Sequence, residues 1–209
     1  LDNPAIANPV ASLISATTTY TVTASDIYGC TSTATVTVNV NPLTVSAAGA
    51  PTTICEGASV SLTSTVAGGG EPYTYSWSDG TSVVGTTATL SVSPTSTTTY
   101  TLTVSDACLN SVTATPVTIT VNPAPGVSVT PSSALYCPPT AVALTASSGT
   151  GGTTFAWSPG TGLNATTGAT VNASPTTSTT YTVTGTGTNG CTSTVTVAIT
   201  TGTAITVDA

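Results

Sequence analysis

Three nearly identical segments, each centred on a tyrosine that follows a run of threonines, divide the chain at regular intervals. The segments are Thr17–Thr23, Thr97–Thr103 and Ser178–Thr184. Their tyrosines stand about 80 residues apart, and a fixed period of this length is the signature of a repeat architecture. The period therefore constrains the fold before any local pattern is considered.

Other residues recur with the same spacing and set the limits of the repeats. The matching pairs are Trp77 with Trp157, Cys55 with Cys137, and Asn41-Pro42 with Asn122-Pro123. We therefore predict that residues 43–123 and 124–203 are two complete repeats and that residues 1–42 are the C-terminal half of another. Residues 204–209 resemble the first strand of a complete repeat. We expect a further repeat to begin there, in a parent protein much longer than this chain.

Within each complete repeat, apolar residues alternate with Thr and Ser, which indicates strands with one buried face. In residues 43–123 the alternating runs contain Val60 and Leu62; Tyr73, Tyr75 and Trp77; Leu90 and Val92; Tyr100, Leu102 and Val104; Val117, Ile119 and Val121. Gly and Pro clusters separate the runs, and Asn189-Gly190 predicts a two-residue hairpin turn. Roughly seven short strands in about 80 residues predict an all-β fold of tandem immunoglobulin-like β-sandwich repeats that form an elongated array. We expect the Trp and Tyr of each repeat in its core.

The half repeat at residues 1–42 lacks the front strands that would cover its apolar face. Val22, Val36 and Val38 belong to that face. We expect that this half is not stable alone, and that upstream residues or strands donated by another chain cover it.

The chain has no Lys, Arg or His and seven Asp and Glu residues, which gives a net charge of −7. Catalysis by general acids and bases near neutral pH depends on His or on other groups with tuned pKa values. We therefore expect no catalytic residues, no cofactor and no enzyme activity. Nucleic-acid binding draws on Lys and Arg at the phosphates, so we exclude a nucleic-acid partner. We also expect no membrane insertion, because no apolar run approaches the roughly 20 residues of a spanning helix.

Calcium rigidifies many repeat arrays and takes six to eight oxygen ligands, usually including several carboxylates. Asp26 and Asp106 occupy matching places in two repeats, but the third has residues 185–188 there instead. The remaining carboxylates are scattered along the chain. We therefore predict no calcium site and no other metal site.

Several stretches carry a resemblance to a known group of repeats. They are Pro51–Gly57, Trp157–Asn164, and Thr180–Val183 leading to Asn189–Thr192. They resemble the Ig-like and PKD-like repeats of giant surface adhesins and of proteins exported by the type IX secretion system of gliding bacteria. The resemblance covers the whole chain and implies an extracellular location at the bacterial cell surface. Such repeats serve as stalks of adhesins, in gliding-motility filaments and beside enzyme domains, and they imply no catalytic residues.

Five cysteines without any His and without a C-x-x-C spacing indicate disulfides in an exported protein. They are Cys30, Cys55, Cys108, Cys137 and Cys191. In one alternative each repeat closes on itself, with Cys55 bonded to Cys108 and Cys137 bonded to Cys191. Cys30 then has no partner in this chain.

The second alternative joins successive repeats. In an immunoglobulin-like sandwich the loop before strand B and the F–G hairpin lie at opposite ends, about 17–20 Å apart, whereas bridged Cα atoms lie within about 7 Å. Cys55 could instead reach Cys191 across the junction between repeats. Cys30 and Cys108 would then pair upstream of this chain and Cys137 downstream of it. We favour this alternative, and both remain open from the sequence.

The sequence supports three hypotheses for function. The favoured one is a structural stalk or fibre segment of a long extracellular adhesin or filament, with neighbouring repeats or identical chains as partners. The second is a carbohydrate- or surface-binding module for a surface polysaccharide, in which Tyr28 and Tyr136, both placed in loops, are the candidate contacts. The third is a set of accessory repeats of a secreted enzyme whose catalytic domain lies elsewhere.

Overall fold

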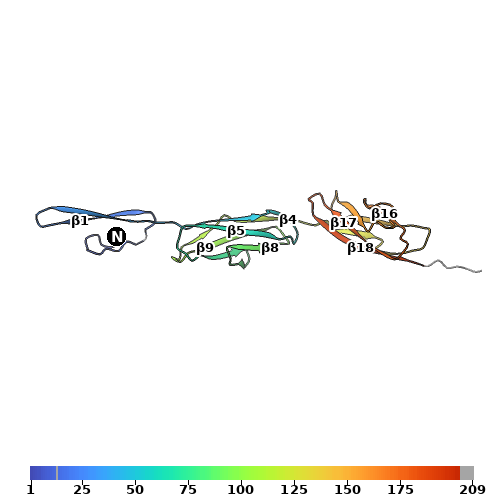
Figure 1. The fold of residues 1–209 in the computed structure, drawn as a ribbon, viewed down its shortest axis with the longest axis horizontal. Helices are drawn as coiled ribbons and strands as arrows, with labels where there is room; N and C mark the ends of the chain where they lie inside the picture. Colours follow the sequence, from blue (N-terminus) through green and yellow to red (C-terminus); the bar gives the residue numbers. More distant parts are fainter. Residues whose placement is uncertain (13, 203–209) are drawn as a thin grey trace, which may run out of the picture. The chain divides into compact units, whose positions relative to one another are not determined.

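The computed structural model describes residues 1–12 and 14–202, which are built of strands and loops with no helix (Figure 1). The predicted start of a further repeat, residues 204–209, lies outside this described part. The chain divides into two compact units. One comprises residues 1–51, 60–92 and 99–118, and the other comprises residues 52–59, 93–98 and those from 119 onwards.

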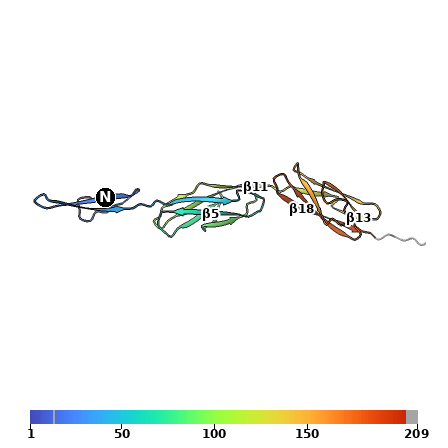
Figure 2. The same cartoon turned by 45° about the horizontal axis from the view of Figure 1, so that its top comes forward.

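Residues 127–201 form a seven-stranded sandwich. One sheet has the order β12 (Val127–Thr130), β14 (Val142–Ser148), β16 (Thr170–Ala173). The other has the order β13 (Ser133–Tyr136), β18 (Thr192–Thr201), β17 (Thr179–Thr186), β15 (Thr154–Ser158). All pairings are antiparallel except that of β13 with β18, which lie side by side in Figure 2. In immunoglobulin notation the sheets are A-B-E and A′-G-F-C, which confirms the immunoglobulin-like fold.

The alternating pattern of β17 places its apolar residues in the core of this sandwich. Tyr181 and Val183 are fully buried there, together with Trp157 of β15. The two aromatic side chains satisfy their polar atoms with backbone carbonyls: Tyr181 Oη donates to Thr161 O at 2.7 Å, and Trp157 Nε1 donates to Gly168 O at 2.9 Å. Burial raises the pKa of the Tyr181 hydroxyl. These aromatic side chains are therefore structural.

Residues 44–122 have the same sheet order, with β7 added and the last strand divided into β10 and β11. The first sheet is β3 (Thr44–Ala50), β5 (Val60–Ala67), β8 (Thr89–Val92). The second is β4 (Thr53–Cys55), β11 (Val117–Asn122), β9 (Thr98–Ser105), β6 (Thr74–Ser78), β7 (Val83–Gly85), with β10 (Ser111–Thr113) also beside β9. Trp77 of β6 is fully buried and donates from Nε1 to Thr87 O at 3.0 Å. It thus repeats the role of Trp157.

Residues 1–42 contain one hairpin, β1 (Thr18–Ser25) paired with β2 (Thr31–Val38). Two of its side chains that match core positions of the third repeat are open to solvent, while Tyr20 and Val38 are half-buried. Val22 is 65% exposed and Val36 is 62% exposed, whereas the equivalent Val183 and Val197 are 0% and 1% exposed. The hairpin therefore has the F and G strands of a repeat, with an apolar face that is only partly covered.

A disulfide-linked turn as the candidate functional site

The three turns that join strands F and G are closed by the same backbone hydrogen bonds. After β17, Gly187 N donates to Cys191 O at 2.9 Å and Gly190 N donates to Gly187 O at 3.0 Å. The same two bonds close the turns at residues 26–30 and 106–110. Each turn is therefore a five-residue unit whose positions can be compared one by one.

The fourth position of each turn has the left-handed conformation. It is occupied by Gly29 with φ 85°, Leu109 with φ 65° and Gly190 with φ 79°. Each turn therefore has a three-residue loop between its closing residues, with the left-handed residue last. The prediction of a two-residue turn at Asn189-Gly190 was wrong, because the Asn-Gly pair forms the end of this longer loop and not the whole of it.

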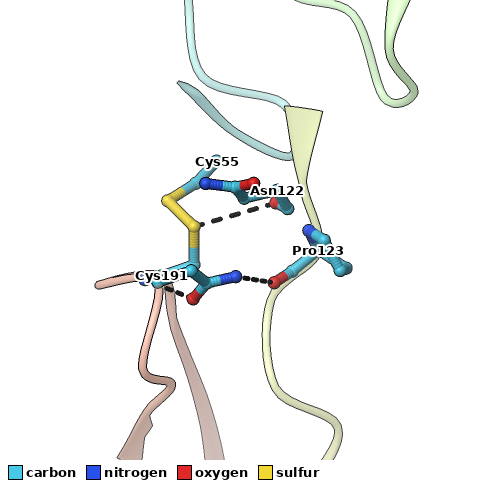
Figure 3. Close-up of a disulfide and its surroundings, with 5 residues drawn as sticks. Cys55, Asn122, Pro123 and Cys191 are labelled. Carbon is cyan, nitrogen blue, oxygen red and sulfur yellow. Dashed lines mark hydrogen bonds between the residues drawn. A yellow bond between two sulfur atoms is a disulfide. The ribbon is translucent and has the colours of Figure 1, made fainter. Parts of the chain in front are cut away.

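A disulfide joins the fifth position of the last turn to the second repeat. Cys191 bonds Cys55, which ends β4, and the two Cα atoms lie 5.6 Å apart (Figure 3). This spacing is in the ordinary range for a disulfide. The bond links residues of successive predicted repeats, as in the second of the two alternatives drawn from the sequence. The bonds of the first alternative, Cys55 to Cys108 and Cys137 to Cys191, are not the ones the structure contains.

The same turn also binds the linker that precedes its own repeat. Asn189 Nδ2 donates to Pro123 O at 3.0 Å, while Asn189 Oδ1 accepts from Cys191 N at 3.1 Å (Figure 3). Ser193 Oγ donates to Pro125 O. Cys191 Sγ, which carries no proton in the disulfide, lies 3.7 Å from Asn122 O. The turn and the start of β18 thus contact three backbone carbonyls between Asn122 and Pro125, and Cys191 is buried beside them.

The turn of the second repeat is held by a buried carboxylate instead. Asp106 is 5% exposed. Its Oδ1 accepts from Cys108 N and Asn110 N, both at 2.9 Å, and its Oδ2 accepts from Asn110 Nδ2 at 2.9 Å and Gly70 N at 3.1 Å. The side-chain bond from Asn110, with the backbone N–H groups of Asn110, Gly70 and Cys108, holds the pKa of Asp106 below its ordinary value of 3.8. The chain has no cationic side chain, so N–H donors alone compensate this charge.

This carboxylate also organises the loop that contacts the first linker. Gly69 N donates to Asn41 O at 2.8 Å, next to the Gly70 N–H that Asp106 accepts. Ala107 N donates back to Gly70 O at 2.9 Å. Gly68 passes so close to the linker that a Cβ placed on it would lie 2.0 Å from Pro42 O. The linker contact therefore needs glycine at this position.

The side chains of the other predicted site residues take no part in the disulfide. Cys30, Cys108 and Cys137 are free and exposed. Tyr28 is 85% exposed in its turn, and its role as a surface contact stays a prediction. Tyr136 was placed in a loop, but it ends β13 and is only 6% exposed, because the parallel pairing with β18 turns it into the core. It therefore does not present a surface for a partner.

The roles of Asn189, Asn110 and Ser193 were not foreseen from the sequence. A signal was present for the first two, since each stands in a turn that also contains a cysteine and follows an F strand. Within residues 1–12 and 14–202, no three His, Cys, Asp or Glu side chains gather as a metal site would require. In the same described part, no helix is long and apolar enough to cross a membrane.

No protein-family model matches the sequence, and a search of curated proteins finds no significant match. Solved structures that resemble the chain include three N-terminal domains of the highly immunogenic outer capsid protein of bacteriophage RB49, with 22% identity over 77% of this chain and 59% of that one, at a TM-score of 0.39. Another is the eight N-terminal Ig domains of the Down syndrome cell adhesion molecule, with 14% identity, 90% and 28% coverage, and a TM-score of 0.43. The chain thus spans less than two thirds of either structure.

A third similar structure is the C-terminal fragment of intimin in complex with the intimin-binding domain of its translocated receptor. The identity is 15%, the coverage is 76% of this chain and 64% of that one, and the TM-score is 0.40. The Ig-like fold of the present chain is established by its own strand order.

Proposed function

We propose that the chain is a structural segment of a stalk or fibre and has no catalytic role. The stalk or fibre belongs to a long extracellular adhesin or filament at the cell surface, which serves adhesion or gliding motility. The observation that carries the proposal is the Cys55–Cys191 disulfide. It gives two successive predicted repeats a covalent connection in addition to the linker. Disulfides persist in oxidising compartments, which supports an extracellular location.

The contacts around the disulfide support a spacer function. Pro123 has a fixed φ, its carbonyl is bound by Asn189, and the carbonyl of Pro125 is bound by Ser193. The disulfide adds a restraint that covalently closes this group of residues. A linker restrained in this way has few conformations left, which is what a spacer between repeats requires.

The partners on this proposal are neighbouring repeats of the same long chain or identical chains in a filament. The net charge of −7 and the absence of cationic side chains support this view, because they leave no basic patch for an acidic ligand. The abundant Thr and Ser side chains on the exposed strand faces are uncharged and suit a long solvent-facing surface.

The proposal is tested by measuring how freely the two complete repeats move with and without the disulfide. Spin labels carried by unnatural amino acids at the exposed positions Thr63 and Thr196 report the distribution of distances between the repeats by pulsed electron resonance. In the oxidised chain we expect a narrow distribution, and in the Cys55→Ser, Cys191→Ser double variant a wider one. The matched control is Cys30→Ser, Cys108→Ser, which removes two free thiols and should leave the width unchanged. Equal widths in all three proteins would refute the spacer proposal.

One observation favours the binding-module alternative. Ile27 and Tyr28 are 91% and 85% exposed in adjacent positions of a turn, which is an apolar pair of the kind that contacts a ligand. On the spacer proposal this turn instead faces the linker before its repeat, because Asn189, at the position of Tyr28 in the last turn, binds the preceding linker. Retention of the chain on immobilised surface polysaccharide, lost in Tyr28→Ala and kept in Tyr73→Phe, would favour the binding module.

A further inference from the structure

Cys137 occupies the position that Cys55 has in the preceding repeat. Ile54 pairs in parallel with Val121, so Cys55, the next residue, lies beside Asn122 at the end of its sandwich. In the same way Tyr136 pairs in parallel with Thr201, so Cys137 lies beside Gly202. The final strands end alike, since Val121 N donates to Thr97 Oγ1 at 3.1 Å and Thr201 N donates to Ser178 Oγ at 3.0 Å. A Cβ on Gly202 would lie 3.4 Å from Cys137 Sγ. The thiol therefore stands at the matching place beside the last residue of the repeat.

Cys30 occupies the position that Cys191 has in the last turn. Asp26 N donates to Cys30 O at 3.0 Å and Gly29 N donates to Asp26 O at 3.2 Å, as in the turn of Cys191. In both turns the backbone N–H of the cysteine is also held by a side-chain oxygen: Asp26 Oδ1 at 2.9 Å for Cys30, and Asn189 Oδ1 at 3.1 Å for Cys191. Cys30 is nonetheless exposed and free, whereas Cys191 is buried and bonded.

Cys108 does not share this position. It is the third residue of its turn and corresponds to Tyr28 and Asn189, while the fifth position is taken by Asn110. The side chain of Asn110 is engaged with Asp106. The chain therefore contains one bonded pair, Cys55 and Cys191, and one unbonded copy of each of its two positions.

We propose that Cys137 forms a disulfide with the immunoglobulin-like repeat that follows its own repeat in the same chain. Its partner is a cysteine at the fifth position of the F–G turn of that following repeat, which is the position that Cys30 and Cys191 have in their turns. The inference deepens the proposed function, because it treats the Cys55–Cys191 bond as a device that recurs from repeat to repeat. Specificity comes from the turn, since in the bonded junction the fifth position carries the sulfur that bonds Cys55, while the third position, Asn189, binds the Pro123 carbonyl.

Bond formation removes the two S–H protons and two electrons from the thiols and forms one S–S bond. The oxidant is a disulfide compound such as oxidised glutathione, which accepts the two electrons and two protons and is released as two thiols. The exchange passes through a mixed disulfide on one of the two cysteines, and the thiolate of the other displaces the leaving thiol. The exposure of Cys137 allows access of the oxidant.

The test replaces residues 204–209 by a second copy of residues 124–202. In the second copy Cys137→Ser removes a competing thiol, and Thr192→Ser marks the peptide that contains the turn cysteine by its mass. The protein is refolded in a glutathione redox buffer and digested with pepsin at low pH, where thiolate exchange is suppressed. We expect mass spectrometry of the unreduced peptides to find Cys137 joined to the marked turn cysteine, in a yield similar to that of Cys55 joined to Cys191.

Two control variants of the appended copy test the position. Cys191→Ser should abolish the bond to Cys137. Asn189→Cys combined with Cys191→Asn reproduces the arrangement of the second repeat, with cysteine third and asparagine fifth, and should give at most a small yield. Thermal unfolding of each reduced protein checks that the appended copy is folded.

The outcomes separate this inference from the proposed function. A free Cys137 beside a formed Cys55–Cys191 bond overturns the inference alone, and so does an equal yield with the cysteine in the third position. Absence of the Cys55–Cys191 bond in the same digest overturns both, because that bond carries the proposed function.

Discussion

The linkers Asn41-Pro42 and Asn122-Pro123 have the same sequence, yet the repeats that follow them bind them in different ways. At Asn122-Pro123 the F–G turn supplies a disulfide through Cys191 and a side-chain hydrogen bond through Asn189. At Asn41-Pro42 the loop at residues 68–70 supplies a backbone hydrogen bond, and Asp106 holds that loop to its turn.

The difference lies in three turn positions. The first is Asp106 in one repeat and Gly187 in the other, the third is Cys108 or Asn189, and the fifth is Asn110 or Cys191. The same turn of the same fold can therefore be held in two ways. In one repeat Asp106 binds Asn110, and in the other Cys191 bonds the distant Cys55. We expect the first arrangement to be weakened by acid and the second by reductant.

Loss of the disulfide should have the largest effect. Cys191→Ser in oxidising buffer should lower the free energy of unfolding by about 2–4 kcal/mol, because the unbridged chain gains conformational entropy when unfolded. Urea denaturation of the wild type with and without reductant checks this, and reductant should reproduce the variant. Cys137→Ser, at an exposed free thiol, should change nothing. Matching urea midpoints for Cys191→Ser and the wild type would contradict the prediction.

The glycine that faces the first linker should come next. Gly68→Ala should cost about 2–3 kcal/mol, because a left-handed alanine costs about 1–2 kcal/mol and its Cβ also displaces the Pro42 carbonyl. Gly80→Ala is the matched control, since Gly80 also has a positive φ but a Cβ on it meets nothing within 4 Å. Thermal unfolding should therefore show a clearly smaller loss for Gly80→Ala. Equal losses would mean that the linker contact contributes nothing.

Acid should weaken the turn held by Asp106 and spare the turn held by Cys191. The pKa of Asp106 is lowered in the folded chain, so its ionised form stabilises the fold above the ordinary value of 3.8, and this stabilisation is lost as the pH falls below that value. Hydrogen bonds from the Thr81 side chain and the Ser82 and Thr81 backbone lower the pKa of Asp79 to about 2, so its contribution is lost over a similar range that extends to about pH 2.

Calorimetric scans between pH 5 and pH 2 of Asp106→Asn, Asp79→Asn and the wild type separate the two carboxylates. Asp106→Asn should unfold at a lower temperature at pH 5 and show a shallower decline with acid than the wild type. An unchanged decline would show that Asp106 does not supply the acid sensitivity of the second repeat.

The smallest effect is expected at Leu109. This exposed residue has φ 65°, where its two counterparts are glycines. Leu109→Gly should stabilise the second repeat by up to about 1 kcal/mol, because relief of the left-handed conformation exceeds the added entropy of glycine in the unfolded chain. Leu135→Gly, at an exposed strand position, should instead destabilise by about 0.5–1 kcal/mol. Chemical denaturation that gave both changes the same sign would contradict this.

The fold could be predicted from the sequence because its signals are periodic. The recurrence of the Thr-Thr-Tyr segments and the alternation in β9 and β17 identified the sandwich and placed Trp77, Trp157 and Tyr181 in its cores. Tyr136 was misplaced because β13 has only four residues and pairs with residues of β18 that are more than 60 positions away along the chain, about four fifths of a repeat. A strand so short shows no local alternation that distinguishes it from a loop.

The candidate site could be predicted only in part. In an immunoglobulin-like sandwich the loop before strand B and the F–G hairpin lie at opposite ends. This separation is enough to favour a disulfide between repeats over one within a repeat. The hydrogen bonds of Asp106 could not be foreseen, because Gly70 is 36 residues away in sequence and reaches the carboxylate only through the loop geometry. The same is true of Asn189 and Pro123, which are 66 residues apart.

The Cys55–Cys191 bond also determines which part of the chain can carry mechanical load. When the two ends are pulled, the covalent path runs from Cys55 through the sulfur atoms to Cys191, and the residues between them bear no tension. The bonded residues are 136 positions apart, and at about 3.3–3.6 Å for each extended residue roughly 450–490 Å of contour length is held in reserve. Trp77 and Trp157 lie within this stretch, whereas β3 and β18, which complete the two sandwiches, lie outside it. The strands between the two cysteines therefore cannot be extended by the pulling force until the bond is reduced.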